Sequence, residues 1–188
     1  MPQAKTDRRV KYTKMVLKNS LVELLEDTPI EKVTVKEICE KADINRGTFY
    51  AHYKDQAALY QEAVNELVEG ALDILKNGNY TDEEGLFKTV VSIYEYIKEN
   101  SELCKIFLNI SGIHVNNNKV YEIIRSIYFP DMGKLSSDSD INAAATAFAT
   151  MGNVAIIKNW LNGGMEKSIE EMAEFSIKLT IEGLNALK

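Results

Sequence analysis

The chain has 188 residues, of which 45% are hydrophobic and 27% are charged, and its formal net charge is −6; these proportions are those of an ordinary globular protein. No stretch approaches the roughly 18 consecutive apolar residues of a membrane helix, and the polar N-terminus lacks the apolar core of a secretion signal. The two cysteines, Cys39 and Cys104, fall on apolar faces of predicted helices, as buried thiols do in a reducing compartment. We therefore expect a cytoplasmic protein that makes no contact with a membrane.

Charge is distributed unevenly along the chain. Residues 1–54 carry 11 Lys and Arg against 8 Asp and Glu, a net charge of +3, whereas residues 55–188 carry 11 against 20, a net charge of −9. In the first twenty residues a single aspartate accompanies six basic residues, namely Lys5, Arg8, Arg9, Lys11, Lys14 and Lys18. A basic N-terminal part favours a polyanionic partner although the whole chain is acidic. For Lys5 to Arg9 alone, a solvated tail without a partner is the alternative.

The first predicted helix follows residues 1–9, which have no periodicity and are expected to form a mobile arm. It runs from Val10 to about Glu26, and its buried stripe consists of leucines, Leu17, Leu21, Leu24 and Leu25. Pro29 ends this region because proline disfavours helical backbone in the residue before it.

Residues 34–55 have the pattern of two short helices joined by a tight turn. Thr34 and Glu37 have the spacing of a capping box, which begins the first helix. Asn45 can cap the second, over residues 46–53, whose sequence RGTFYAHY has low helix propensity. The side chains expected to close the small core are Val33, Ile38, Ile44 and Phe49. A short helix with hydrogen-bonding side chains on most of its surface predicts a helix-turn-helix that reads DNA.

Residues 34–38 and 42–55 resemble the signature of the TetR/AcrR family of bacterial transcription regulators, above all in the run that begins at Arg46. The resemblance implies an all-α fold, with a three-helix DNA-binding domain over residues 1–54. A long fourth helix would join it to a helical domain for ligand binding and dimerisation over residues 55–188. The resemblance also implies phosphate anchors at Thr34, Lys36, Tyr50, His52 and Lys54. Many members carry a lysine just after the position of Asp55; here that residue is Gln56, so this contact is not carried over.

Arg46 is the best candidate for a base contact, since arginine can bind guanine through two hydrogen bonds. Thr48 could contact a thymine methyl group or a phosphate, and Gly47 would let the protein backbone approach the DNA closely. Tyr12 and Thr13 could add contacts to the DNA backbone. The full set of DNA-binding candidates is Thr34, Lys36, Asn45, Arg46, Gly47, Thr48, Tyr50, His52, Tyr53 and Lys54. Packing against a neighbouring helix is the alternative for Tyr53 in particular, and also for His52 and Tyr50.

The rest of the chain is predicted to be helical throughout. The expected helices span residues 55–76, 81–100, 101–109, 119–129, 140–162 and 168–187, and the polar stretch over 131–140 is expected to be mobile. Asp55 caps the first of these helices, which is too long to serve the N-terminal domain alone. We expect it to link the two domains.

The last two helices predict an interface between two copies of the chain. The helix over 140–162 is rich in small residues, and the apolar residues of the helix over 168–187 cover about two-thirds of its circumference, more than one buried face requires. We therefore expect a homodimer through a four-helix bundle, with Ala143, Ala147, Met151, Val154, Phe175 and Leu179 as candidate interface residues. A fully enclosed core helix in a monomer is the alternative.

The resemblance further implies a ligand pocket in the C-terminal domain, whose occupancy would shift the fourth helix and change the spacing of the two DNA-binding domains. Candidate lining residues are Tyr94, Phe107, Tyr121, Tyr128, Phe148 and Met151, and for each an ordinary place in the core is the alternative. The tail from Gly152 to Ala173 also resembles a regulator sub-type of Gram-positive bacteria. Nothing in the sequence identifies the ligand.

An enzymatic function is not expected, because the sequence has no metal-ligand spacing, no phosphate-binding glycine loop and no nucleophile elbow. No cofactor and no metal are expected either. The sequence predicts a transcriptional regulator, a ligand-responsive repressor that binds a pseudo-palindromic operator as a dimer. The alternative is a helix-turn-helix regulator or activator controlled by a protein partner instead of a small ligand.

Overall fold

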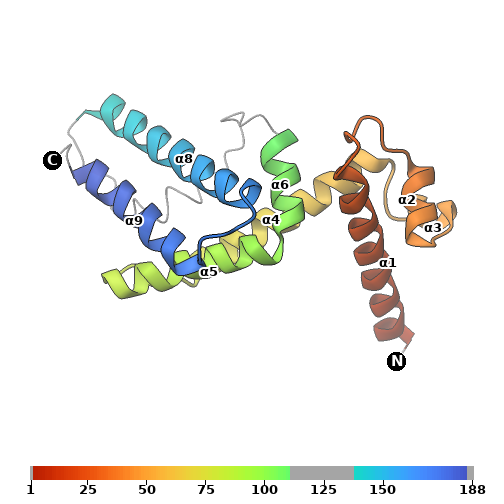
Figure 1. Ribbon diagram of the computed structural model, residues 1–188. Coiled ribbons are helices and arrows are strands. Elements are labelled where there is room, and N and C mark those ends of the chain that lie inside the picture. The colour runs from red at the N-terminus through yellow and green to blue at the C-terminus, as the bar shows by residue number, and fades with distance from the viewer. Residues whose placement is uncertain (1, 111–137, 186–188) are drawn as a thin grey trace. The chain divides into compact units, whose positions relative to one another are not determined.

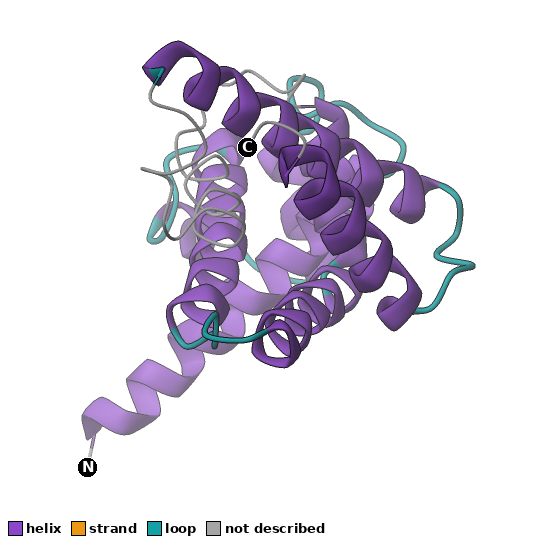
Figure 2. Cartoon of the chain, turned by 90° about the vertical axis from the view of Figure 1, so that its left-hand side faces the viewer, coloured by secondary structure: helices purple, strands orange, loops and turns teal. Residues whose placement is uncertain are grey.

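The computed structural model describes residues 2–110 and 138–185, and within them every regular element is an α-helix (Figure 1; Figure 2). The expected all-α fold is therefore confirmed. The chain forms two compact units, Met1–Leu67 and Val68–Lys188, referred to below as the N-terminal and C-terminal units. Their boundary lies inside helix α4 (Gln56–Lys76), whereas the predicted domain boundary preceded this helix. The first half of α4 thus belongs to the N-terminal unit.

Three helices precede α4 in the N-terminal unit: α1 (Pro2–Leu25), α2 (Val35–Ala42) and α3 (Arg46–Tyr50). Helix α1 packs against α2, and α2 against α3. The core residues are fully or almost fully buried and include Leu17, Leu21, Val33, Ile38, Phe49 and Leu59. Of the predicted core residues, Leu24 and Ile44 are half-buried. Burial of this apolar cluster holds α2 and α3 in place, since helices of eight and five residues are too short to be stable alone.

Two helix ends differ from those predicted. Helix α1 begins at Pro2 and not at Val10; proline suits the first helical position, and the residues after it include good helix formers. The expected arm over residues 1–9 is thus helical from residue 2. Helix α3 ends at Tyr50 and not at Tyr53, in keeping with the low helix propensity of Gly47 and the aromatic residues.

The turn between α2 and α3 is fixed by local hydrogen bonds. The predicted capping box is present: the Glu37 amide donates to Thr34 Oγ1 at 3.2 Å, and the Thr34 amide donates to Glu37 Oε2 at 2.8 Å. Asp43 ends α2 with a left-handed backbone conformation, at a φ of 52°. The Gly47 amide then donates to Asn45 Oδ1 at 2.7 Å and so begins α3. These contacts fix where α2 begins and ends and where α3 begins.

The C-terminal unit contains the end of α4 together with α5 (Glu83–Glu99), α6 (Ser101–Ile110), α8 (Ser139–Asn162) and α9 (Ile169–Asn185). Helix α9 packs against both α5 and α8, and α6 packs against α5 and α8 (Figure 1). The helix predicted over residues 119–129 and most of the polar stretch over 131–140 lie outside the described residues. None of the described helices has the length and apolarity needed to cross a membrane.

Helices α8 and α9 bury several polar side chains. These residues are Thr146, Thr150, Asn153, Ser176 and Thr180. Asn153 Nδ2 donates to Thr180 Oγ1 across the helix pair at 3.0 Å, and to the Ala149 carbonyl oxygen at 2.8 Å. Because buried polar groups must be paired, these bonds favour one register of α8 against α9.

Candidate nucleic-acid interface

Helix α3 exposes nearly all of its side chains. Arg46, Gly47 and Thr48 are exposed and Tyr50 is 58% exposed, whereas Phe49 is fully buried. Phe49 anchors the helix in the core, with its ring edge-on to Tyr50 at 5.6 Å. A helix with one buried residue in five contributes little to the core, so its exposed residues are available for binding.

The N-terminus of α2 provides the second group of candidates. Thr34 and Lys36 are both exposed, and Lys36 forms an ion pair with Glu40 at 3.7 Å. Hydrogen bonds from the Thr34 hydroxyl and amide hold the pKa of Glu37 below its usual value. The hydroxyl of Thr34 is therefore engaged with Glu37. The ion pair of Lys36 is a solvent-exposed one of the kind that contributes little to stability, so this side chain can exchange its partner for a phosphate at small cost.

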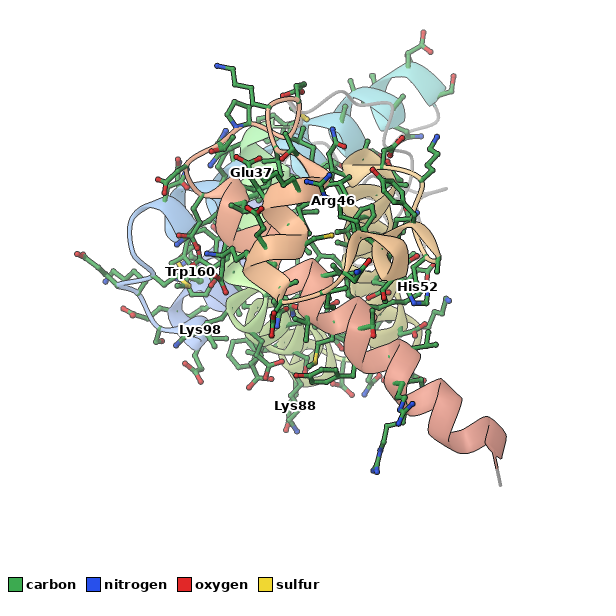
Figure 3. All side chains as sticks on the ribbon, turned by 90° about the vertical axis from the view of Figure 1, so that its right-hand side faces the viewer. Glu37, Arg46, His52, Lys88, Lys98 and Trp160 are labelled. Atoms are coloured by element: carbon green, nitrogen blue, oxygen red, sulfur yellow. The ribbon has the colours of Figure 1, made fainter. Side chains whose placement is uncertain are left out.

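The residues that follow α3 divide into exposed and buried ones. Lys54 is exposed and lies 3.9 Å from the carboxylate of Asp55, while His52 is half-buried, with its ring centroid 6.3 Å from that of Tyr53 (Figure 3). Tyr53 is only 4% exposed. Its hydroxyl donates to Glu62 Oε1 on α4 at 2.9 Å, and its pKa is raised by burial and by the Glu62 carboxylate. Tyr53 was predicted as a DNA contact; its burial removes it from the binding surface, and the packing alternative describes its place.

The partner of Tyr53, Glu62, could not be found from the sequence. It lies nine residues later on an ordinary amphipathic helix, and no motif distinguishes it from the other acidic residues of α4. Lys14 on α1 also binds this carboxylate, at 3.0 Å and 3.3 Å from its two oxygens. Burial alone would raise the pKa of Glu62, but the hydrogen bonds from Lys14 and Tyr53 outweigh burial and lower it.

Several cations of the N-terminal unit have no acidic partner among the described residues. Lys14, Lys18 and Lys41 pair with Glu62, Glu66 and Glu23 respectively. In contrast, no ion pair joins an acidic residue to Arg8, Arg9, Lys11, Lys32 or Arg46, and all of these are exposed. Tyr12 is also exposed, whereas Thr13 is half-buried. The surface of this unit thus combines unpaired positive charge with exposed hydrogen-bonding side chains.

The structure describes four of the six predicted pocket residues. Tyr94 is buried, with its ring edge-on to Trp160 at 5.3 Å, and Phe107 is half-buried. Phe148 is 73% exposed and Met151 is 37% exposed. The other two candidates, Tyr121 and Tyr128, lie outside the described residues. A hollow of about 740 Å³ between the end of α4 and the start of α5 is lined by none of these six residues.

Most of the predicted interface residues are exposed or half-buried apolar side chains of α8 and α9, and these side chains are referred to below as the apolar surface of the two helices. Phe175 and Leu179 are each 52% exposed, Ala143 is exposed and Ala147 is half-buried. Val154 is the exception: it is 3% exposed and belongs to the core, because it lies on the buried side of α8. Ile141 and Phe148, exposed on α8, extend the apolar surface, and residues 141–157 contain no charged side chain.

Comparison with known proteins agrees with this geometry. A sequence model described as the C-terminal region of a transcriptional regulator matches residues 84–182, and one for bacterial regulatory proteins of the tetR family matches residues 20–63. The helix-turn-helix-type transcriptional regulator YxbF of Bacillus subtilis is 26% identical over 162 residues; this covers 84% of the present chain but 42% of YxbF.

Solved structures share the fold at low sequence identity. NalD of Pseudomonas aeruginosa, the secondary repressor of the MexAB-OprM multidrug efflux pump, is 15% identical with a TM-score of 0.67, over 94% of this chain and 97% of NalD. The transcriptional regulator FadR of Bacillus subtilis, solved with stearoyl-CoA, is 16% identical with a TM-score of 0.64, over 90% of this chain and 98% of FadR. The sequence matches and the fold together show that this chain belongs to the tetR family of bacterial regulatory proteins.

Proposed function

We propose that this protein is a cytoplasmic, sequence-specific DNA-binding regulator that acts as a homodimeric, ligand-responsive repressor. The observation that carries the proposal is the exposure of Arg46, Thr48 and Tyr50 on a helix anchored by a single buried residue. Phosphate contacts supply affinity, whereas contacts to base edges supply sequence choice. An exposed arginine without an acidic partner at the start of a helix suits base recognition in the major groove.

The proposed DNA surface contains α3, the N-terminus of α2 and the residues just after α3. Within it, Arg46 would bind a guanine edge, Thr48 a thymine methyl group or a phosphate, and Gly47 would allow close approach of the backbone. The phosphate anchors would be Thr34, Lys36, Tyr50, His52 and Lys54, while Asn45 holds the helix start. With several phosphate contacts, affinity should fall steeply as salt concentration rises.

Dimerisation is proposed from the apolar surface of α8 and α9. A helix exposed to water normally carries charged residues on its outer face, but residues 141–157 carry none. Phe148, Phe175 and Leu179 would be buried by the same surface of a second copy, as the two-fold symmetry of most homodimers requires. Two DNA-binding units related by this axis would select a pseudo-palindromic operator with half-sites about one helical turn apart.

Control by a small ligand is proposed from the family and from two of its members. NalD is by name a repressor, and FadR was solved with stearoyl-CoA. A ligand can change operator affinity only if it binds one conformation of the protein better than another. Control by a protein partner is the second candidate, and release of operator by a purified partner but by no small molecule would favour it.

The test of the proposed function is selection of bound duplexes from random DNA, followed by affinity measurement on the selected sequence and on a scrambled one. Arg46→Ala should lower affinity for the selected duplex by about ten- to a hundred-fold and relax the preference at one base pair of each half-site. Lys41→Ala is the matched control, because it removes an equal charge from α2 but from an ion pair with Glu23. If no sequence is enriched, the proposed function is wrong; if Arg46→Ala weakens binding to both duplexes equally, Arg46 contacts phosphate.

A further inference from the structure

One carboxylate joins three elements of the N-terminal unit. Glu62 on α4 accepts a hydrogen bond from the Tyr53 hydroxyl at 2.9 Å and from Lys14 Nζ on α1 at 3.0 Å. Lys14 Nζ also lies over the Tyr53 ring, 5.5 Å from its centroid. One turn further along both helices, Lys18 pairs with Glu66. Tyr53 immediately follows the turn after α3. Its hydroxyl is held by Glu62, and its ring is in contact with Lys14.

Helix α3 needs such a second point of attachment. It has five residues, and Phe49 is its one buried side chain. A helix held by one residue can rotate about that residue, and a rotation of α3 would displace Arg46 from a base edge. Tyr53 follows Phe49 by four residues, its amide donates to the Phe49 carbonyl oxygen at 2.9 Å, and the two ring centroids are 5.7 Å apart. Fixing Tyr53 therefore fixes the direction in which the exposed side chains of α3 point.

We propose that Tyr53 and Glu62 are positioning residues for DNA recognition: their hydrogen bond sets the orientation of α3, although neither residue touches DNA. The inference rests on the proposed function, since it concerns how well the protein distinguishes its operator from other DNA. Phenylalanine in place of Tyr53 would fill the same space in the core. Tyrosine differs from phenylalanine by the hydroxyl group, and this group forms the hydrogen bond to Glu62 on α4.

The test compares Tyr53→Phe with the wild-type protein on the selected operator and on a scrambled duplex of equal length. Loss of the hydroxyl should lower operator affinity about five- to ten-fold, because a small rotation of α3 would weaken the base contact of Arg46 without removing it. Affinity for the scrambled duplex should stay unchanged, because phosphate contacts tolerate small rotations of α3. Tyr80→Phe is the matched control, since it removes a hydroxyl that donates to the Leu75 carbonyl oxygen at 2.9 Å in the C-terminal unit; it should leave both affinities unchanged.

A second pair of variants separates positioning from general stability. Glu62→Gln keeps an oxygen that can accept the Tyr53 hydroxyl and should retain most of the discrimination between the two duplexes, whereas Glu62→Ala should lose it. Adding Tyr53→Phe to Glu62→Ala should cause no further loss, because the bond is already absent. All measurements are made well below the melting temperature of each variant. If Tyr53→Phe does not fold, the inference is tested by the difference in discrimination between Glu62→Gln and Glu62→Ala alone.

Three results would overturn the inference: unchanged discrimination in Tyr53→Phe, an equal loss of affinity for both duplexes, or equal discrimination by Glu62→Gln and Glu62→Ala. These results can be distinguished from failure of the proposed function. If the proposed function is wrong, the wild-type protein itself will show no preference for any DNA sequence, and the inference will be wrong as well.

Discussion

The two units of this protein leave different chemistry exposed. On the N-terminal unit, the exposed side chains of α3 are polar, aromatic or cationic, and Arg46 has no acidic partner among the described residues. On the C-terminal unit, α8 and α9 expose Phe148, Phe175 and Leu179, and residues 141–157 of α8 carry no charge. The first surface suits DNA, which is a polyanion whose base edges form hydrogen bonds. The second surface suits another apolar surface, such as that of a second copy of the chain. The contrast agrees with the proposal that the N-terminal unit binds DNA and the C-terminal unit forms the dimer.

The difference extends to how each unit is stabilised. In the N-terminal unit, ion pairs of Lys14 with Glu62 and of Lys18 with Glu66 join α1 to α4. The contact between α8 and α9 uses uncharged polar groups such as Asn153 and Thr180. A change of pH should therefore act mainly on the N-terminal unit, and a change of apolar surface mainly on the C-terminal one.

The largest expected effect comes from placing a charge on the apolar surface. Phe175→Glu should convert the dimer to a monomer, because burying a carboxylate in an apolar interface is strongly unfavourable. Loss of the second DNA-binding unit should then lower operator affinity by about a hundred-fold or more. Light scattering coupled to size-exclusion chromatography measures the mass. Glu174→Lys, a charge change on the exposed polar side of α9, should remain dimeric, and a dimeric Phe175→Glu would place the interface elsewhere.

A tenfold effect is expected from Arg46→Lys. Lysine keeps the charge but lacks the planar fork that binds guanine through two hydrogen bonds. Affinity for the operator should fall by about ten-fold, whereas affinity for scrambled DNA and its salt dependence should stay as in the wild type. Fluorescence anisotropy at several salt concentrations measures both. Equal affinity of Arg46→Lys for the operator would show that only the charge matters.

A smaller effect is expected from the two capping boxes, one in each unit. Thr34 with Glu37 begins α2, and Ser168 with Glu171 begins α9, with amide-to-side-chain distances of 2.8–3.2 Å. Thr34→Ala and Ser168→Ala should each cost about 1 kcal/mol of stability in denaturant unfolding. Only Thr34→Ala should also weaken operator binding. A similar loss of operator binding in Ser168→Ala would contradict the assignment of DNA binding to the N-terminal unit and dimerisation to the C-terminal unit.

The smallest effect concerns the acid sensitivity of the N-terminal unit. The pKa of Glu62 in the folded chain is lowered from 4.5, so its contribution to stability is present above about pH 4.5 and is lost as the pH falls through the lower folded value. This contribution is at most about 1 kcal/mol for a partly exposed pair. Glu62→Gln should therefore show a flatter dependence of melting temperature on pH between about 5 and 3. Glu69→Gln, on the exposed side of α4, should follow the wild type.

Local patterns in the sequence were sufficient for most of the fold. The capping boxes at Thr34 and Ser168, the Asp55 cap, whose carboxylate accepts from the Ala58 amide at 2.8 Å, and the apolar periodicities placed most helix ends within one or two residues. The start of α1 was missed because residues 2–9 have no apolar periodicity to indicate a helix.

Contacts between distant segments could not be predicted. The bond from Tyr53 to Glu62 joins residues whose spacing carries no signal, and it removed one candidate from the DNA surface. Val154 was assigned to the wrong face because α8 is apolar nearly all round, so that its composition does not show which side meets α9. For the proposed DNA surface, the exposure of each side chain could be predicted from its residue type. For the proposed dimer surface it could not, because apolar residues suit both a core and an interface.

The central claim is that the N-terminal unit recognises DNA and that the C-terminal unit forms the dimer. Its most direct test is a hydroxyl-radical footprint on the selected operator, made with the wild type and with Phe175→Glu. For the wild type we predict two protected segments related by a two-fold axis and about one helical turn apart. At a concentration high enough to saturate binding, Phe175→Glu should protect each half-site independently, so that a duplex with one half-site binds it as well as the full operator does. A wild-type footprint without two-fold symmetry, or an unchanged preference of Phe175→Glu for the full operator, would contradict the account.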